Sequence, residues 1–238
     1  MICLRSVKYS DSRSILSGFS RERGRVSVSV PSGRGRSAAR LRALTMPLSV
    51  IDVETTDGSD RREILTLRSA VPAVVAPNVV SNPARSTQAV FLAEVLGTVL
   101  RQSEEDRGVF GFVEQSVRVL DALPARRTGM FHIAFLSGLT RLLGIEPDVS
   151  TYGAGTGFFD LREGIWRGNA PVHPDFLEAA ESRGAYLLAR SGYETACRLG
   201  WGRVERRRAL DLLLRYYSIH IAPLTGLKSL DVLRSLTC

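Results

Sequence analysis

The chain has 238 residues, of which 44% are hydrophobic, and its formal net charge is +8. This length and apolar content exclude a disordered tail and allow one large domain or two small ones. No apolar run approaches the roughly 18 residues of a membrane helix, and the first residues hold no signal-peptide core, so we expect a cytoplasmic protein.

The whole positive excess lies in residues 1–45. This segment has ten basic and two acidic side chains, whereas the remaining residues carry 22 of each sign. The basic residues are Arg5, Lys8, Arg13, Arg21, Arg23, Arg25, Arg34, Arg36, Arg40 and Arg42. A guanidinium holds phosphate through a rigid fork of donors. The segment is therefore predicted to bind a polyanion, with these ten side chains as the contacts.

The basic segment begins a series of short predicted strands. Residues 25–30, RVSVSV, alternate strictly between apolar and polar side chains, which is typical of a half-buried strand. Residues 15–19 form a second strand, joined to the first through a tight turn ending at Gly24. Further strands are predicted at 4–7, 48–54 and 63–68. The last two are joined by a turn at 56–59, and 31–45 is interpreted as a loop.

Five short strands in about seventy residues predict a small barrel. A barrel of this size with a basic face is typical of the OB-fold, which binds single-stranded nucleic acid. We therefore expect an α+β protein: a five-stranded OB-fold barrel at residues 1–75, a linker at 76–82 and an all-α domain at 83–238. The linker lies in a stretch punctuated by Pro72, Pro77 and Pro83.

The carboxyl two-thirds shows helical periodicity. Helices are predicted at 82–101, 108–123 and 127–143, near 173–177, and at 203–221 and 228–236, giving a bundle of about six. An irregular segment at 146–172 contains the glycine-rich residues 152–160. It is predicted to be either a functional loop or a small hairpin. A nucleotide-binding loop is disfavoured because no strand precedes the glycines and no Gly-Lys-Ser/Thr follows them.

Few residues indicate catalysis or metal binding. The cysteines, Cys3, Cys197 and Cys238, are scattered and lack a C-x-x-C pair, so we expect reduced structural thiols. The histidines, His132, His173 and His220, are far apart in sequence and lie beside apolar residues, which favours structural roles. Motifs of hydrolases and metalloproteases are missing from the sequence. We expect a protein without a cofactor that is not an enzyme.

A second group of arginines opens the helix predicted at 203–221. Arg203, Arg206, Arg207 and Arg208 lie at the positive end of the helix dipole, which is unfavourable unless an anion binds there. Two interpretations stay open, a solvated face balanced by Glu205 and Asp211, or a docking site for an acidic peptide or DNA.

In order and spacing, several segments resemble the bacterial RecO family of recombination mediators. The matching segments are 4–12, 19–24, 47–48, 91–96, 158–164, 173–174, 212–220 and 227–233. The resemblance implies an N-terminal OB-fold, a helical C-terminal domain and association with the nucleoid. It also implies binding of single- and double-stranded DNA, annealing of complementary strands, and partnership with RecR and the acidic C-terminal tail of single-strand binding protein in loading recombinase.

Two departures from the family are visible. Many relatives carry four zinc-binding cysteines where this chain has its glycine-rich segment, so we expect no zinc. The chain also begins about two residues before the first predicted strand, so that strand is expected to be incomplete unless the start lies further upstream. Two other functions stay open, an OB-fold RNA-binding module and a protein-interaction scaffold.

Overall fold

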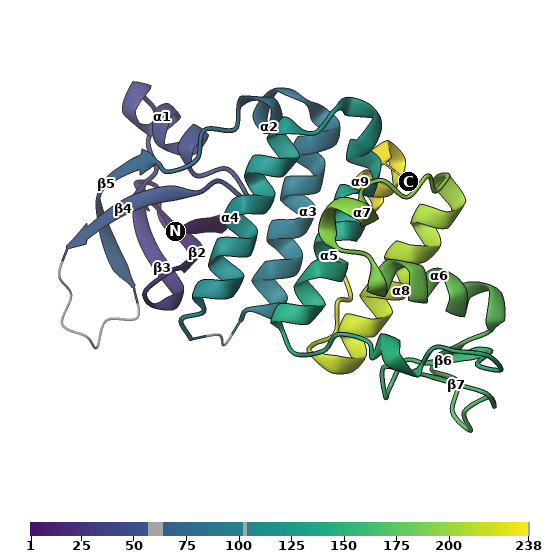
Figure 1. Ribbon diagram of the computed structural model, residues 1–238. Coiled ribbons are helices and arrows are strands. Elements are labelled where there is room, and N and C mark those ends of the chain that lie inside the picture. The colour runs from purple at the N-terminus through teal and green to yellow at the C-terminus, as the bar shows by residue number, and fades with distance from the viewer. Residues whose placement is uncertain (57–63, 102–103, 238) are drawn as a thin grey trace. The chain divides into compact units, whose positions relative to one another are not determined.

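The computed structural model describes residues 1–56, 64–101 and 104–237 (Figure 1). Contacts divide the chain into two compact units. The first consists of Met1–Ala122 with Leu227–Leu233, and the second of Leu123–Gly226 with Arg234–Cys238.

A five-stranded barrel opens the first unit. Its strands are β1 (Ile2–Lys8), β2 (Arg13–Ser20), β3 (Gly24–Pro31), β4 (Ile51–Thr56) and β5 (Leu65–Pro72). They pair in the order β1-β2-β3-β5-β4, with β3 and β5 parallel. A bridge between Ile2 and Val50 joins β1 to the segment before β4 and closes the sheet. The predicted OB-fold barrel is therefore confirmed.

Alternation along the strands builds the barrel core. Leu16, Val28 and Val30 point inward and pack with Cys3 and Ile51. The predicted hairpin between β2 and β3 is confirmed, because Gly24 takes a φ of 61° at the turn. β1 pairs with β2 from Ile2 to Lys8, longer than the strand predicted at 4–7. The turn predicted at 56–59 lies, after its first residue, outside the described residues.

The loop predicted at 31–45 is wrong in its second half, because α1 (Arg36–Leu44) forms there. Ala38 is buried and Leu41 packs against the barrel core. The interrupting arginines hid the helical period in the sequence. The helix depends on the end of the barrel for its apolar contacts rather than on a full apolar stripe of its own.

Three helices complete most of the first unit. They are α2 (Pro77–Ser81), α3 (Pro83–Val99) and α4 (Arg107–Ala122), so the segment predicted as a linker contains a short helix. The Asn82 side chain accepts from the Arg85 amide and Pro83 takes the first helical turn, as expected for this start. β1 contacts both α3 and α4, and the Arg85 guanidinium donates to the Leu120 carbonyl at 3.1 Å.

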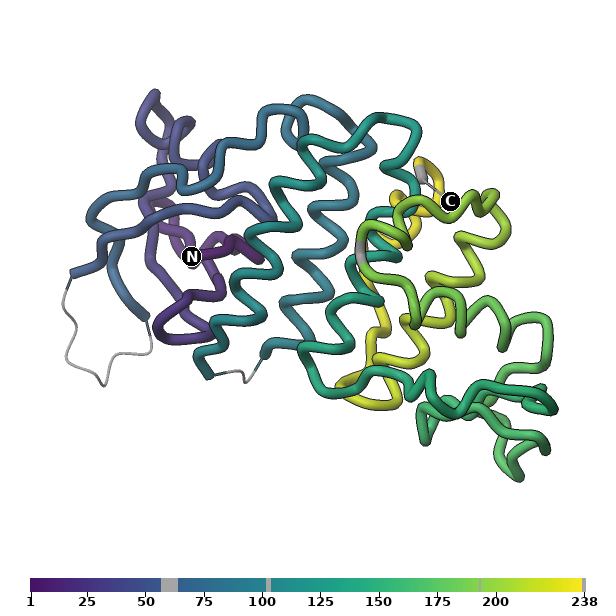
Figure 2. Tube along the Cα trace, viewed as in Figure 1, coloured from purple at the N-terminus to yellow at the C-terminus, as the bar shows by residue number. Residues whose placement is uncertain are grey.

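The second unit is mainly helical and contains a small sheet, which the trace in Figure 2 follows. Its elements are η1 (Ala125–Met130), α5 (Phe131–Leu142), η2 (Val149–Thr151), β6 (Phe158–Asp160), β7 (Ile165–Arg167), β8 (Phe176–Leu177), α6 (Ala179–Arg190), α7 (Tyr193–Ala196), α8 (Arg203–His220) and the end of α9 (Leu230–Thr237). The strands pair in the order β7-β6-β8. The hairpin interpretation of the glycine-rich segment is therefore confirmed.

The helix predicted near 173–177 is wrong. This segment is extended, because Phe176 and Leu177 pair with Asp160 and Phe159 as β8, and α6 begins only at Ala179. The end predicted for the helix at 127–143 is confirmed by Gly144, whose φ of 69° stops α5. Over the described residues, no helix is both long and apolar enough to cross a membrane.

Candidate nucleic-acid interface

OB-folds bind oligonucleotides over the face of their second and third strands and over adjoining loops, which include the loop between strands 1 and 2. In this barrel that region is the outer surface of β2 and β3 with the β1–β2 loop, and β1 flanks it. Cross-strand pairs place Arg5 opposite Ser17 and Val7 opposite Ile15. On β3, Ser27 lies opposite Ser17 and Ser29 lies opposite Ile15. Neighbouring residues such as Leu16 point into the core. We call the outward set the open barrel face: Arg5, Val7, Arg13, Ile15, Ser17, Ser27 and Ser29.

Two cations stand at the β1–β2 end of this face. The Arg13 guanidinium donates to the Ser29 hydroxyl at 2.8 Å, which holds Arg13 over β3. Lys8 forms an ion pair of 2.9 Å with Asp11, and both side chains are largely exposed. Such an exposed pair contributes little to stability. Lys8 can therefore exchange Asp11 for another anion at small cost.

Tyr9 lies in the β1–β2 loop with 73% of its surface exposed, and Val7 beside it is 46% exposed. Aromatic rings on such faces stack on unpaired bases. Tyr9 was not among the contacts predicted from the sequence, because that prediction rested on basic side chains alone. An aromatic residue between a predicted strand and an Asp-Ser turn was the available signal.

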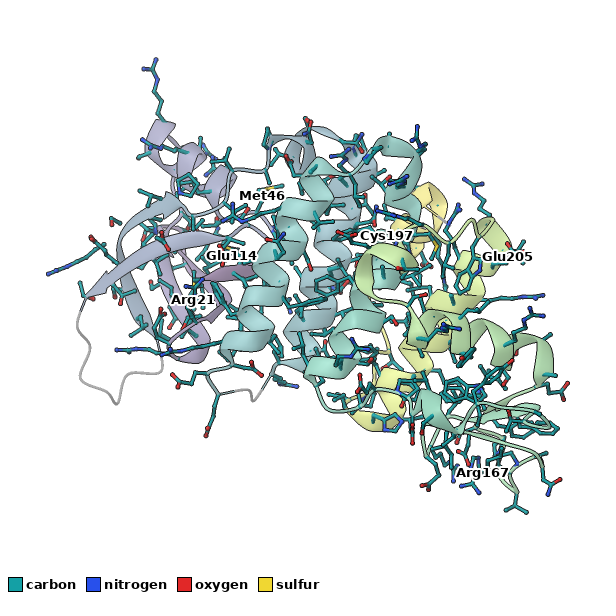
Figure 3. All side chains as sticks on the ribbon, viewed as in Figure 1. Arg21, Met46, Glu114, Arg167, Cys197 and Glu205 are labelled. Atoms are coloured by element: carbon teal, nitrogen blue, oxygen red, sulfur yellow. The ribbon has the colours of Figure 1, made fainter. Side chains whose placement is uncertain are left out.

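Arg21 and Arg25, predicted as contacts, point instead toward helices of the same unit. Arg21 forms an ion pair of 2.8 Å with Glu114 of α4 and lies 4.7 Å from the centre of the Phe110 ring. Figure 3 shows Arg21 and Glu114 facing each other. Arg25 is half-buried and directs Nη1 toward the Gly97 carbonyl of α3 at 3.5 Å. Burial lowers the pKa of Arg25, and the Arg101 charge lowers that pKa further.

The other arginine of the β2–β3 turn, Arg23, is exposed. Its backbone amide donates to the Ser20 hydroxyl at 2.9 Å, which fixes the turn and leaves the guanidinium in solvent. Together with Arg21, it marks the end of the barrel opposite Tyr9. The ten predicted contacts therefore do not form one continuous patch.

The arginines of α1 and the segment before it form a second group. The Ser32 amide donates to the Ser12 carbonyl at 2.8 Å, so this segment starts beside the β1–β2 loop. Arg34, Arg36 and Arg40 are exposed and form no ion pair with any described residue. Arg42 donates to the Gly33 carbonyl at 2.9 Å. The basic side chains of the open barrel face and those of α1 therefore lie around the same end of the barrel.

Arg36 and Arg40 are four residues apart on α1 and so lie on the same side of the helix. Two like charges at this spacing destabilise a helix by about 0.2–0.5 kcal/mol. The first turn of α1 also has no acidic residue to favour its amino end. A bound polyanion would relieve this repulsion.

The outer side of β4 carries acidic side chains. Asp52 and Glu54 on β4 are exposed, and Glu54 accepts from the Ser69 hydroxyl at 2.9 Å. Arg68 on β5 is also exposed and was not among the predicted contacts, because it lies outside the first 45 residues. Among the residues of β4 and β5, two acidic side chains thus stand against one arginine.

The arginines predicted for partner binding lie at the start of α8 in the second unit. Arg206 is half-buried and donates to the Trp201 carbonyl at 2.7 Å. Arg203, Arg207 and Arg208 are exposed. The group therefore divides into one side chain that shapes the start of α8 and three that face solvent.

A hollow of about 550 Å³ lies between α6 and α8 in this unit. Arg208 stands at its edge, and Leu187, Trp201 and Leu212 supply apolar lining. The edge carries both signs of charge, including Arg183, Glu181, Glu205, Asp211 and Arg215. Asp211 pairs with Arg234, and Arg215 pairs with Asp175 at 2.7 Å.

The histidines of the second unit have structural surroundings. Burial, helped by the charge of Arg206, lowers the pKa of His132 to about 3, so this ring is neutral at pH 7. His173 Nε2 lies 3.4 Å from Asp160 and His220 Nε2 lies 2.8 Å from the Leu161 carbonyl. Within 1–56, 64–101 and 104–237, no group of three or more His, Cys, Asp or Glu residues could hold a metal ion.

Cys3 and Cys197 are buried free thiols. Burial raises the pKa of Cys3 to about 12, and burial with the Glu194 charge raises that of Cys197 to about 11. Both thiols therefore stay protonated at neutral pH and are poor nucleophiles.

Comparison with known proteins matches the chain along nearly its full length. Residues 1–74 match the family model "Recombination protein O N terminal" and residues 80–231 match "Recombination protein O C terminal". The chain is 35% identical over 237 residues to "DNA repair protein RecO" of Phocaeicola vulgatus, covering 99% of this chain and 96% of that protein. The proteins of the same description from Porphyromonas gingivalis and Bacteroides fragilis are 34% and 31% identical, with the same coverage. The chain belongs to the RecO family of DNA repair proteins.

Proposed function

We propose that this protein is a non-enzymatic recombination mediator. It binds single- and double-stranded DNA, anneals complementary strands, and helps load recombinase together with RecR on DNA coated by single-strand binding protein. The observation that carries the DNA-binding part is the pair Arg36 and Arg40, which share one side of α1 without an ion pair among the described residues. Family membership supports the role in repair.

The proposed annealing mechanism is electrostatic. Two complementary strands repel each other through their phosphates, and arginines that neutralise phosphates of both strands lower this repulsion. The open barrel face and α1 would hold the backbones, so the bases of the two strands stay free to pair. The acidic outer side of β4 keeps the strands on one side of the barrel.

The first test measures binding of single-stranded DNA against salt. If about six phosphates are contacted, the logarithm of the affinity falls against the logarithm of salt with a slope near −4. Affinity then drops roughly a few hundredfold between about 50 and 200 mM salt. A slope near zero would rule out phosphate contacts as the main source of affinity.

Charge reversal locates the contacts. Arg34, Arg36, Arg40 and Arg42 are changed together to Glu, and we expect DNA binding and annealing to be lost while the unfolding midpoint changes little. As a matched control, Arg107, Arg126, Arg190 and Arg198, which are exposed, are changed to Glu, which alters net charge equally. Equal loss in both variants would show that net charge, rather than this surface, governs binding.

Partner binding is proposed for the start of α8. Arg203, Arg207 and Arg208 would pair with the acidic tail of single-strand binding protein, and the hollow beside Arg208 would take an apolar side chain of that tail. We expect the Arg207→Glu/Arg208→Glu variant to bind a labelled tail peptide at least tenfold more weakly by fluorescence anisotropy. Arg126→Glu/Arg190→Glu is the control, and equal loss in both variants would move the site elsewhere.

A further inference from the structure

The first unit contains an apolar hollow that the DNA-binding proposal does not use. It has a volume of about 380 Å³ and is bordered by the end of α1, the start of β4, α2 and α3. Its walls include Leu44, Met46, Ile51, Val79 and Ala89, and the polar side chains of its described lining are serines. We call it the barrel groove.

The rim of the barrel groove exposes large apolar side chains. Val75 is 75% exposed, Val80 62%, Met46 40% and Val90 39%. Contiguous apolar surface of this kind marks binding sites for other molecules. A small ligand inside the hollow would leave Val75 and Val80 in water. A peptide lying across the rim would cover both the hollow and the exposed valines.

The charge beside the groove selects the kind of peptide. Ala43 and Leu44 line the groove, and Arg40 precedes them by three and four residues on α1, on the same side of the helix. Arg36 lies one helical turn before Arg40, at the start of α1. The apolar lining of the barrel groove thus adjoins two exposed cations, Arg40 and Arg36. Neither has a carboxylate partner in the described part of the chain.

Asp121 of α4 forms no ion pair with Arg36 or Arg40. Its carboxylate is already engaged with α2, where it accepts from the Val79 amide at 2.9 Å and the Asn78 side chain at 3.3 Å. The lining itself contributes no charge from any residue the structure describes.

We propose that the barrel groove binds a segment of a partner protein in which apolar side chains adjoin a run of Asp or Glu. The apolar side chains enter the hollow and cover Val75 and Val80, and the carboxylates pair with Arg40 and Arg36. Because these two arginines also belong to the proposed DNA surface, the segment and DNA compete for them. Only this competition rests on the proposed function. The docking of the segment does not.

A selection experiment identifies the chemistry of the segment. A random twelve-residue peptide library displayed on phage is selected against the full-length protein and counter-selected against Val80→Asp. We expect the surviving peptides to combine apolar residues with an excess of Asp and Glu. Survivors that are basic or uncharged, or a selection in which no peptide distinguishes the two proteins, would overturn the proposal.

Binding of one labelled survivor is then measured by anisotropy. We expect at least tenfold weaker binding to Val80→Asp and to Arg36→Glu/Arg40→Glu. Val172→Asp, which places the same charge at a fully exposed valine, should bind as the unchanged protein does. Thermal unfolding of each variant checks that it is folded. A peptide that ignores the Arg36 and Arg40 reversal would contradict the proposed pairing.

Two further readouts separate this proposal from the proposed function. Single-stranded DNA should bind Val80→Asp and Val172→Asp equally, and the labelled peptide should be displaced by excess DNA. Loss of DNA binding in Val80→Asp alone would assign the groove to DNA and sink the peptide proposal. Weak DNA binding by the unchanged protein, with peptide binding intact, would contradict only the proposed function.

Discussion

At the scale of single residues, the exposed Tyr9 ring separates base stacking from charge as a source of affinity. Stacking on an aromatic side chain contributes about 1–3 kcal/mol per base, so Tyr9→Ala should weaken single-stranded DNA binding roughly 5- to 150-fold. Tyr9→Phe keeps the ring and should bind as the unchanged protein does. Duplex binding should change little in either variant, because paired bases are not available to stack. Anisotropy with matched single- and double-stranded probes measures all three, and an equal loss on duplex would argue against stacking.

The sequence predicts the charge of the site better than its arrangement. A cluster of arginines can be recognised from the sequence alone, and most of these side chains are exposed. Arg21 and Arg25 could not be assigned from the sequence, because their partners Glu114 and Gly97 lie more than seventy residues away. Local patterns carry no information on contacts that form only when α3 and α4 pack on the barrel.

At the scale of elements, Gly164 in the β6–β7 turn holds the small sheet of the second unit. Its φ is 68°, and a Cβ there would lie 2.7 Å from the Tyr216 hydroxyl, which donates to the Ile145 carbonyl. Gly164→Ala combines a strained backbone with this clash, and we expect a loss of about 1–3 kcal/mol in the free energy of unfolding. Gly153→Ala is the matched control, because its Cβ would meet nothing within 4 Å. Urea unfolding compares them, and equal stability would show that the turn is not strained.

Elements were predictable where one local signal dominated. Strict alternation gave β3, and the asparagine–proline start gave α3. The helix expected after Pro174 was wrong because a proline suited to a first helical turn equally suits the extended approach to a strand. α1 was missed because its arginines outnumber the apolar residues that hold it to the barrel.

At the scale of the whole molecule, contacts and composition divide the chain differently. Composition places a boundary at 76–82, and the two family models meet between residues 74 and 80. Contacts instead group the barrel with α2–α4 and with Leu227–Leu233. The division into domains at 1–75 and 83–238 therefore stays a prediction. A deletion of residues 1–75 would remove the surface on which α3 and α4 pack, so point variants are the cleaner tools for testing DNA binding.

The return of the chain to the first unit depends on Glu94 of α3. Its carboxylate accepts from the Ser229 hydroxyl at 2.5 Å, the Ser229 amide at 3.0 Å and the Lys228 amide at 2.9 Å. Burial acts to raise the pKa of Glu94, but the hydrogen bonds from Ser229 and Lys228 outweigh it and hold the pKa below its ordinary value. This carboxylate joins segments 135 residues apart in the sequence.

Glu94→Gln should therefore destabilise the protein in a pH-dependent way. The amide of glutamine cannot accept at both ends of the side chain, so we expect a loss of about 1–3 kcal/mol near pH 7. A pKa lower in the folded than in the unfolded chain gives stability that is present above the unfolded value, about 4.3, and disappears as pH falls through the folded value. The difference in the free energy of unfolding between the unchanged protein and Glu94→Gln, measured by urea unfolding, should thus be constant between pH 6 and 8 and shrink below about pH 4.

Glu104→Gln, at an exposed position, should show no such difference at any pH. A difference for Glu94→Gln that persists unchanged at pH 3.5 would show that the carboxylate charge does not hold the C-terminal segment on α3.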